Sequence, residues 1–187
     1  MREILRKDIV RTRDTGLIPE GMFERLMGDK TLYEYAQSIA YPIERIVEVA
    51  DLAASRDDSA LPKLIAACND PHPVIRYWGA TGCLILQAKA APAKDKLMQL
   101  LRDDWMDIRI VAAEALSYLG ETETALEVLE PIVKSDQEYI SLAALNALDF
   151  MQQAGHVSLD RIRQLIGDTQ FQGLPARIAE YFSQKTL

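Results

Sequence analysis

The sequence predicts an all-α solenoid, a stack of helix pairs, preceded by a helical segment that does not repeat. The first observation behind this prediction is a repeat with an offset of 33 residues, which aligns Arg76 with Arg109. A weaker third copy follows 32 residues later and aligns Ile108 with Ile140. The second observation is helical periodicity in all three copies, without the alternating Val/Ile/Thr pattern of strands. Each unit of such a fold buries its apolar face by packing on its neighbours.

The second helix of each predicted pair has apolar and small residues at the spacing of one helical face. Small residues in the middle of each face allow neighbouring helices to approach closely. The three matching sets are Ile75, Trp78, Gly79, Gly82 and Leu86; Ile108, Val111, Ala112, Ala115 and Leu119; and Ile140, Ala143, Ala144, Ala147 and Met151. The first helices show their own equivalences, which are Leu64, Leu97 and Leu129; Ala67, Leu100 and Ile132; and Cys68, Leu101 and Val133.

These patterns divide the chain into three parts. Residues 43–155 form the repeats, beginning with a helix at about 43–54 that packs on the first pair. Residues 156–187 supply two capping helices, at about 158–166 and 175–184, with Ser158 as N-cap and Gly167 as a stop. Residues 1–42 form the non-repeating segment, which is too short to hold a core of its own.

The N-terminal segment is expected to contain three helices. The first ends near Arg13, a turn follows at 14–16, a short helix begins at Pro19, and another covers 32–39. Its apolar residues require a surface on which to dock, either the repeats or a domain outside this chain. We expect this segment to be the junction to another domain, with a possible docking surface formed by Leu17, Ile18, Met22, Phe23 and Leu26.

The helix pairs resemble short HEAT-like repeats. The features that carry this resemblance are a turn Asp (Asp70, Asp103) and an Arg in the second helix (Arg76, Arg109). The period is shorter than the 40 or so residues usual for HEAT repeats, and the signatures of tetratricopeptide and ankyrin repeats are missing. We expect each Arg to bond a turn Asp of an adjacent repeat. This Asp–Arg ladder should stop at the third copy, where Ser141 takes the place of the Arg.

A second resemblance covers most of the chain. The sequence is similar to the C-terminal helical region of bacterial sulfatases related to N-sulfoglucosamine sulfohydrolase, in which such a region follows a catalytic α/β domain. The segments that carry it are 13–20, Tyr41-Pro42, Asp70-Pro71, 74–80 and 112–116. This resemblance implies an accessory region without the catalytic domain. Neither Cys68 nor Cys83 has the sequence context that the family's modified nucleophile needs, so no active-site residue is carried over.

Composition excludes several classes of function. The net charge of −7 lies entirely in residues 43–187, because residues 1–42 contain seven basic and seven acidic residues. An acidic body is a poor match for phosphate backbones, so we expect no nucleic-acid partner. No apolar run approaches the roughly 20 residues of a membrane span, and the charged N-terminus is not a secretory signal. We therefore expect a cytoplasmic protein, or an exported or periplasmic one if the chain belongs to a longer sulfatase.

No residue set makes a convincing catalytic, cofactor or metal site. His72 and His156 stand alone in predicted loops, where we expect exposed or locally hydrogen-bonded side chains rather than metal ligands. Cys68 and Cys83 are expected in the core on facing helices, with a disulfide as the weaker alternative. The acidic cluster Asp103, Asp104 and Asp107 is compatible with a cation site, but we expect Asp103 and Asp104 to open the helix that begins near Met106.

The aromatic residues divide into core and surface candidates. Trp78 aligns with Val111 and is expected in the core, whereas Trp105 lies in a turn where exposure would suggest a contact. Tyr33, Tyr35 and Tyr41 are explained equally well by a contact surface and by helix packing.

Three functions compete at this point. The first is a non-catalytic interaction module, in particular the accessory region of a sulfatase-like hydrolase, with a protein partner. The second is a stand-alone HEAT-like scaffold that binds a protein through its concave face. The third is an enzyme on a HEAT-like fold, such as a DNA glycosylase or a bilin lyase. The acidic repeat body argues against the glycosylase. The chain has only two Cys and two His, and these provide no specific evidence for a lyase site.

Overall fold

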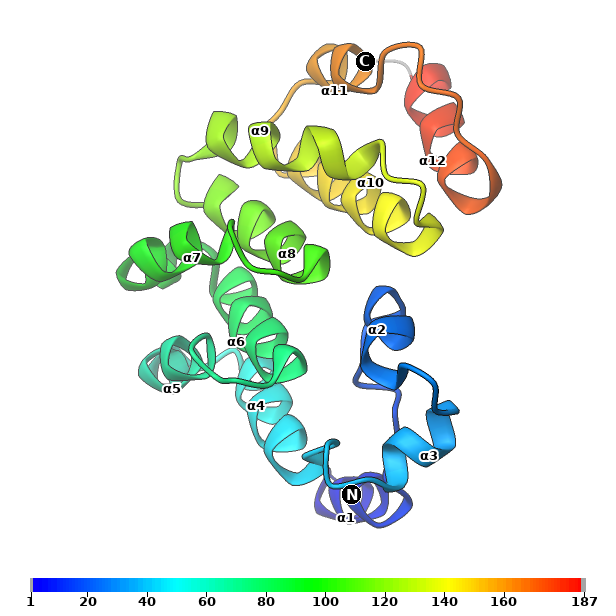
Figure 1. Ribbon diagram of the computed structural model, residues 1–187. Helices are drawn as coiled ribbons and strands as arrows, with labels where there is room; N and C mark the ends of the chain where they lie inside the picture. The colour runs from blue at the N-terminus through cyan, green and yellow to red at the C-terminus, as the bar shows by residue number, and fades with distance from the viewer. Residues whose placement is uncertain (1, 186–187) are drawn as a thin grey trace.

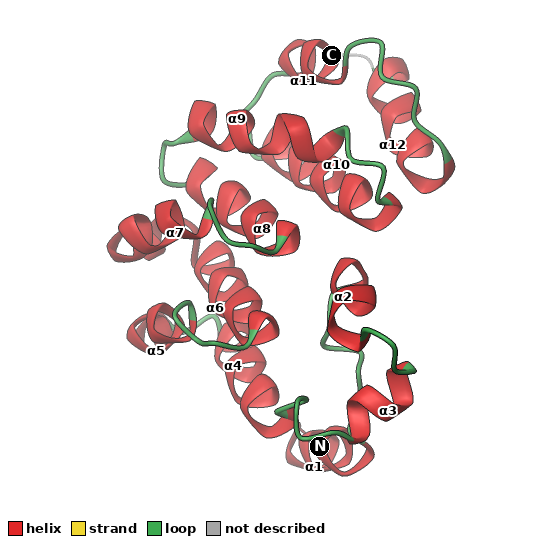
Figure 2. Cartoon of the chain, viewed as in Figure 1, coloured by secondary structure: helices red, strands yellow, loops and turns green. Residues whose placement is uncertain are grey.

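The computed structural model describes residues 2–185, and every regular element in that range is a helix (Figures 1 and 2). The all-α solenoid is confirmed. The paired helices stack in sequence order, with the second helices of the pairs along one side of the stack and the first helices along the other (Figure 1). The second helices are α6 (Pro73–Leu86), α8 (Met106–Ser117) and α10 (Glu138–Gln153), and the first helices are α5 (Leu61–Ala67), α7 (Lys94–Leu100) and α9 (Thr122–Val133).

Both ends of the stack are covered by helices. Helix α4 (Ile43–Ser55) packs on α6, and α1 (Arg2–Thr12) packs on α4. At the other end, α12 (Gly173–Gln184) packs on α10, and α11 (Leu159–Ile166) contacts α9 and α12. The Ser158 side chain accepts a bond from the Arg161 amide and Gly167 ends α11, as the sequence indicated. The capping helices therefore close the apolar faces that the repeats leave open.

The equivalent positions of the first helices form the spine of the core. Leu64, Leu97 and Leu129 are fully buried, and the other two equivalent sets are buried with them. The second helices bury Ala112, Ala144 and their neighbours on the facing side. The 33-residue period thus marks positions that repeat one packing environment in each layer.

Gly79 marks the closest approach of two helices. A Cβ atom at this position would lie 2.9 Å from the Cys68 backbone nitrogen and 2.9 Å from the Leu64 carbonyl oxygen. At Gly82, the atoms nearest to such a Cβ belong to the Leu64 side chain. Helix α5 can approach α6 this closely because Gly79 has no side chain.

We expect Gly79→Ala to lower the free energy of unfolding by about 1–3 kcal/mol, because backbone atoms of α5 must move to admit the methyl group. Gly82→Ala is the matched control, since it gains the same helix propensity and meets a side chain that can shift. Urea denaturation of the two variants checks this. Equal stabilities would mean that α5 and α6 are not held together at Gly79.

The N-terminal segment lies beside the second helices (Figure 1). After α1 it forms the 3-10 helix η1 (Glu20–Met22), α2 (Phe23–Met27) and α3 (Leu32–Gln37). Arg13 ties the end of α1 to the end of α3 by donating to the carbonyl oxygens of Ser38 and Tyr41, at 2.9 and 2.7 Å. Tyr35 and Tyr41 are buried in this contact while Tyr33 is exposed, so helix packing explains two of the three tyrosines.

Candidate functional site

The N-terminal segment packs on the repeats through two tryptophans. Trp78 is half-buried, and its Nε1 donates to the Leu17 carbonyl oxygen at 2.8 Å. The Arg25 guanidinium lies over the Trp105 ring, 4.2 Å from its centroid, and donates to the Asp104 carbonyl oxygen at 2.8 Å. Trp78 packs against the core as expected, but it is only half-buried, and its indole also bonds a segment that the repeat pattern does not describe.

The apolar residues expected as a docking surface are placed against the chain's own repeats. Ile18 and Met22 are buried, and the other three are half-buried against the same core, namely Leu17, Phe23 and Leu26. A partner that contacts the N-terminal segment must therefore use another face of it.

A groove lies where η1 meets the second helices. It has a volume of about 280 Å³ and is lined by η1 with the residue before it and by α6, α8 and α10. Tyr139 and Phe150, from α10, line it and are 51% and 52% exposed, respectively. This groove combines exposed aromatic surface with two carboxyl groups from α8, Asp107 and Glu114.

Both carboxyl groups are buried, and burial governs their acidity. Asp107 is 6% exposed and Glu114 is 9% exposed. Desolvation disfavours the charged form of an acid. It raises the pKa of Asp107 to about 6, with the nearby Glu20 adding to the effect, and raises the pKa of Glu114 to about 7. The side chain of Asp107 also lies close to Gly21, where a Cβ atom would come within 2.5 Å of Asp107 Oδ1.

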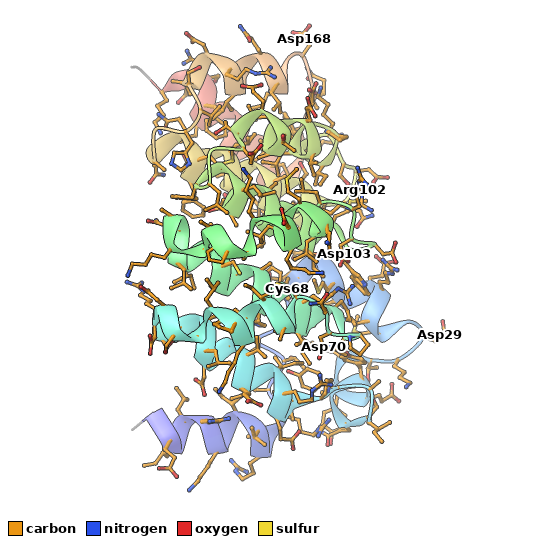
Figure 3. The ribbon with its side chains drawn as sticks, turned by 90° about the vertical axis from the view of Figure 1, so that its left-hand side faces the viewer. Asp29, Cys68, Asp70, Arg102, Asp103 and Asp168 are labelled. Carbon is orange, nitrogen blue, oxygen red and sulfur yellow. The ribbon has the colours of Figure 1, made fainter. Side chains whose placement is uncertain are left out.

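The ladder residues form one complete ion pair between repeats. Arg76 binds Asp103 of the next repeat through two bonds, Nε to Oδ2 at 2.7 Å and Nη2 to Oδ1 at 3.0 Å. Asp70 pairs with Arg45 from α4, a partner that the repeat pattern did not reveal. Asp70 and Asp103 lie one above the other along the same edge of the stack (Figure 3).

Arg109 departs from the ladder. Its Nε donates to the Asp103 carbonyl oxygen, and no ion pair within residues 2–185 includes it. The ladder therefore stops one repeat earlier than expected. Ser141, at the equivalent position in the third copy, donates to the Val133 carbonyl oxygen at 2.6 Å.

The remaining candidate residues have local partners. His72 Nε2 lies 3.2 Å from the Tyr35 hydroxyl, and His156 Nδ1 lies 3.0 Å from the Ser117 hydroxyl.

Cys68 and Cys83 are buried and free, and a hydrogen bond between them together with burial raises the pKa of Cys68. Within the described part of the chain, no group of three His, Cys, Asp or Glu residues could hold a metal ion. Asp103 of the acidic cluster binds Arg76 and accepts from the Trp105 amide at 3.0 Å, so it holds the turn before α8.

Comparison with known families agrees with this architecture. Residues 61–149, which run from α5 into α10, match the family model described as HEAT repeats. These repeats are HEAT-like. No curated protein matches the sequence, so the resemblance to sulfatases gains no support from that comparison. None of the helices between residues 2 and 185 combines the length and the hydrophobicity needed to span a bilayer.

Sequence reasoning did not single out Glu114 as a site residue. A signal was present, because Glu114 is the only charged residue between Ile110 and Ser117, and every residue of that stretch is buried. A charged side chain inside such a run needs either a partner or a function. Its place in the groove depends on the position of η1, which no repeat pattern fixes.

Proposed function

We propose that the chain is a non-catalytic helical-repeat scaffold and that it binds a protein partner in the groove between η1, α8 and α10. The supporting observation is the pair of half-exposed aromatic residues on α10, Tyr139 and Phe150, beside buried carboxyl groups that no other residue neutralises. Aromatic residues are enriched in protein interfaces because they bury a large area at a low cost in side-chain entropy. The HEAT-like repeats supply the rigid frame for such a surface.

A narrower proposal concerns the identity of the partner. The similarity of segments 13–20 and 74–80 to a sulfatase C-terminal region favours a sulfatase-like catalytic domain as the partner. On this proposal the purified chain has no turnover with aryl sulfates or N-sulfated sugars, with or without calcium. Turnover that is lost on replacing Cys68 or Cys83 would contradict it.

Site-specific photo-crosslinking tests the protein partner and its location. The full chain would carry a photoreactive residue at Phe150, inside the groove, or at Glu127 on α9 as the matched control. The captured protein would then be purified and titrated against the unmodified chain. We expect one partner to be captured from position 150 and to bind reversibly, without capture from position 127. Equal capture from both positions, or none from position 150, would contradict the proposal.

A further inference from the structure

The groove is acidic and holds no basic residue. Its carboxyl groups are Asp107, Glu114 and, at the rim, Glu20. None of the residues that line it is Lys, Arg or His. The same chain neutralises Asp103, in the turn before α8 and four residues from Asp107, with Arg76, so the absence of a basic residue is specific to the groove.

The two buried carboxyl groups have no partner from another residue. Among the hydrogen bonds and ion pairs of residues 2–185, none involves the side chain of Glu114, and Asp107 bonds only its own backbone amide. The other buried polar side chains, Ser117 and Ser141, are both hydrogen-bonded. The Glu114 carboxyl oxygens are not fully enclosed, because His72 Nδ1 is the one fully buried side-chain nitrogen or oxygen without a partner in residues 2–185. A partly desolvated carboxyl group without a partner lowers stability, and a cation that reaches it through the groove would remove that cost.

The spacing of the two acids defines the shape of a ligand. Asp107 and Glu114 are seven residues apart on α8, which is two helical turns, so they lie on the same face about 10.5 Å apart along the axis. One ammonium or guanidinium group cannot reach both. A polyproline II segment has three residues per turn and rises about 3.1 Å per residue, so side chains three residues apart lie on one face about 9 Å apart and match this separation.

The part of the groove formed by α10 suits the rest of a basic side chain. Tyr139 and Phe150 are eleven residues apart on α10, about three turns, and both are half-exposed beside the acids. Aromatic faces attract cations, and the methylene stems of Lys and Arg pack on apolar surface while the charged end reaches a polar group.

We infer that the groove binds a basic segment of the partner in the polyproline II conformation, with two Lys or Arg side chains three residues apart directed at Asp107 and Glu114. This inference rests on the proposed function and names the chemistry of the partner. The net charge of −7 also favours a basic partner by long-range attraction.

A synthetic peptide tests the inference on the full chain. The probe is a fluorescein-labelled ten-residue peptide with two lysines three positions apart in a Gly/Ser background, and its control has glutamine at both positions. Binding is measured by fluorescence anisotropy with the wild type, Glu114→Gln and Asp107→Asn. Glu127→Gln and Asp95→Asn, on α9 and α7, remove the same charges from exposed positions as matched controls.

We expect the lysine peptide to bind and the glutamine peptide to fail. Each groove variant should weaken binding about tenfold or more, because it removes a charge-assisted bond, while the control variants change it little. No binding of the lysine peptide, or an equal loss from groove and control variants, would overturn the inference. A partner captured from position 150 whose binding ignores Glu114→Gln would also overturn it and leave the proposed function standing.

Discussion

Replacing Arg76 with alanine is expected to lower the free energy of unfolding by about 3 kcal/mol. Arg76 makes two bonds to the Asp103 carboxylate and also donates to the Asp70 carbonyl oxygen at 2.9 Å. The side chains of Arg76 and Asp103 are 16% and 7% exposed, so the variant leaves a nearly buried carboxylate without its cation. Removing one partner of a buried ion pair lowers the free energy of unfolding by several kcal/mol, because the other charge is left uncompensated. Chemical denaturation of the wild type and the variant measures the difference.

Arg109→Ala is the matched control for this prediction. It occupies the equivalent position one repeat later, where the guanidinium bonds a single backbone oxygen, so we expect a loss of about 1 kcal/mol. Arg76→Lys keeps the charge but cannot reproduce the two parallel bonds, and should fall between the two. Equal losses of stability from Arg76→Ala and Arg109→Ala would contradict the claim that only Arg76 makes a stabilising ion pair between repeats.

Glu114→Gln is expected to have the opposite sign and to stabilise the chain at pH 8. Burial raises the pKa of Glu114 to about 7, so the folded chain holds this proton more tightly than the unfolded chain does. The wild type therefore loses stability as the pH rises from about 4.5 to 7, and the full cost is present above that range. A pKa raised by two to three units corresponds to roughly 3 kcal/mol, part of which the buried amide of Gln offsets. We expect a gain of about 2 kcal/mol.

Thermal denaturation at pH 5 and pH 8 checks the sign. For a chain of this size, 2 kcal/mol corresponds to a shift of about 4–8 °C in melting temperature at pH 8, with little shift at pH 5. Glu127→Gln removes the same charge from an exposed position and should change neither value appreciably. Destabilisation by Glu114→Gln at pH 8 would mean that Glu114 has a structural partner.

Most of the fold could be predicted from the sequence because stacked repeats place equivalent residues in equivalent surroundings. Leu64, Leu97 and Leu129 are buried for the same reason in each layer. The pair of Arg76 with Asp103 follows from the same regularity, since the offset places an Arg near the turn of the next repeat. Arg45 was missed as a partner of Asp70 because it lies on α4, before the recognisable period begins.

The groove could not be predicted because it depends on a segment outside the repeats. Trp78 aligns with Val111, yet it bonds Leu17 because η1 and α2 lie beside this part of the stack. Asp107 and Glu114 are buried where η1 and α10 approach α8. These three elements are far apart in the sequence, so no local sequence pattern reveals the contact. Periodicity predicts which helices stack, but not where a non-repeating segment covers them.

The ionisation of Glu114 is the most direct test of the claim that the groove keeps its carboxyl groups for a basic partner. Carbon-13 NMR of the side-chain carboxyl gives its pKa in the free chain and in the presence of saturating lysine peptide. The titratable groups that face it are Tyr77 from α6, Tyr118 and Asp107 from α8, Tyr139 from α10, and Glu20 from η1, so no basic group of the chain competes. We expect a pKa near 7 in the free chain that falls by at least about one unit with the peptide, by linkage between cation binding and proton release. A pKa near 4.5 in the free chain, or one that the peptide leaves unchanged, would contradict the account.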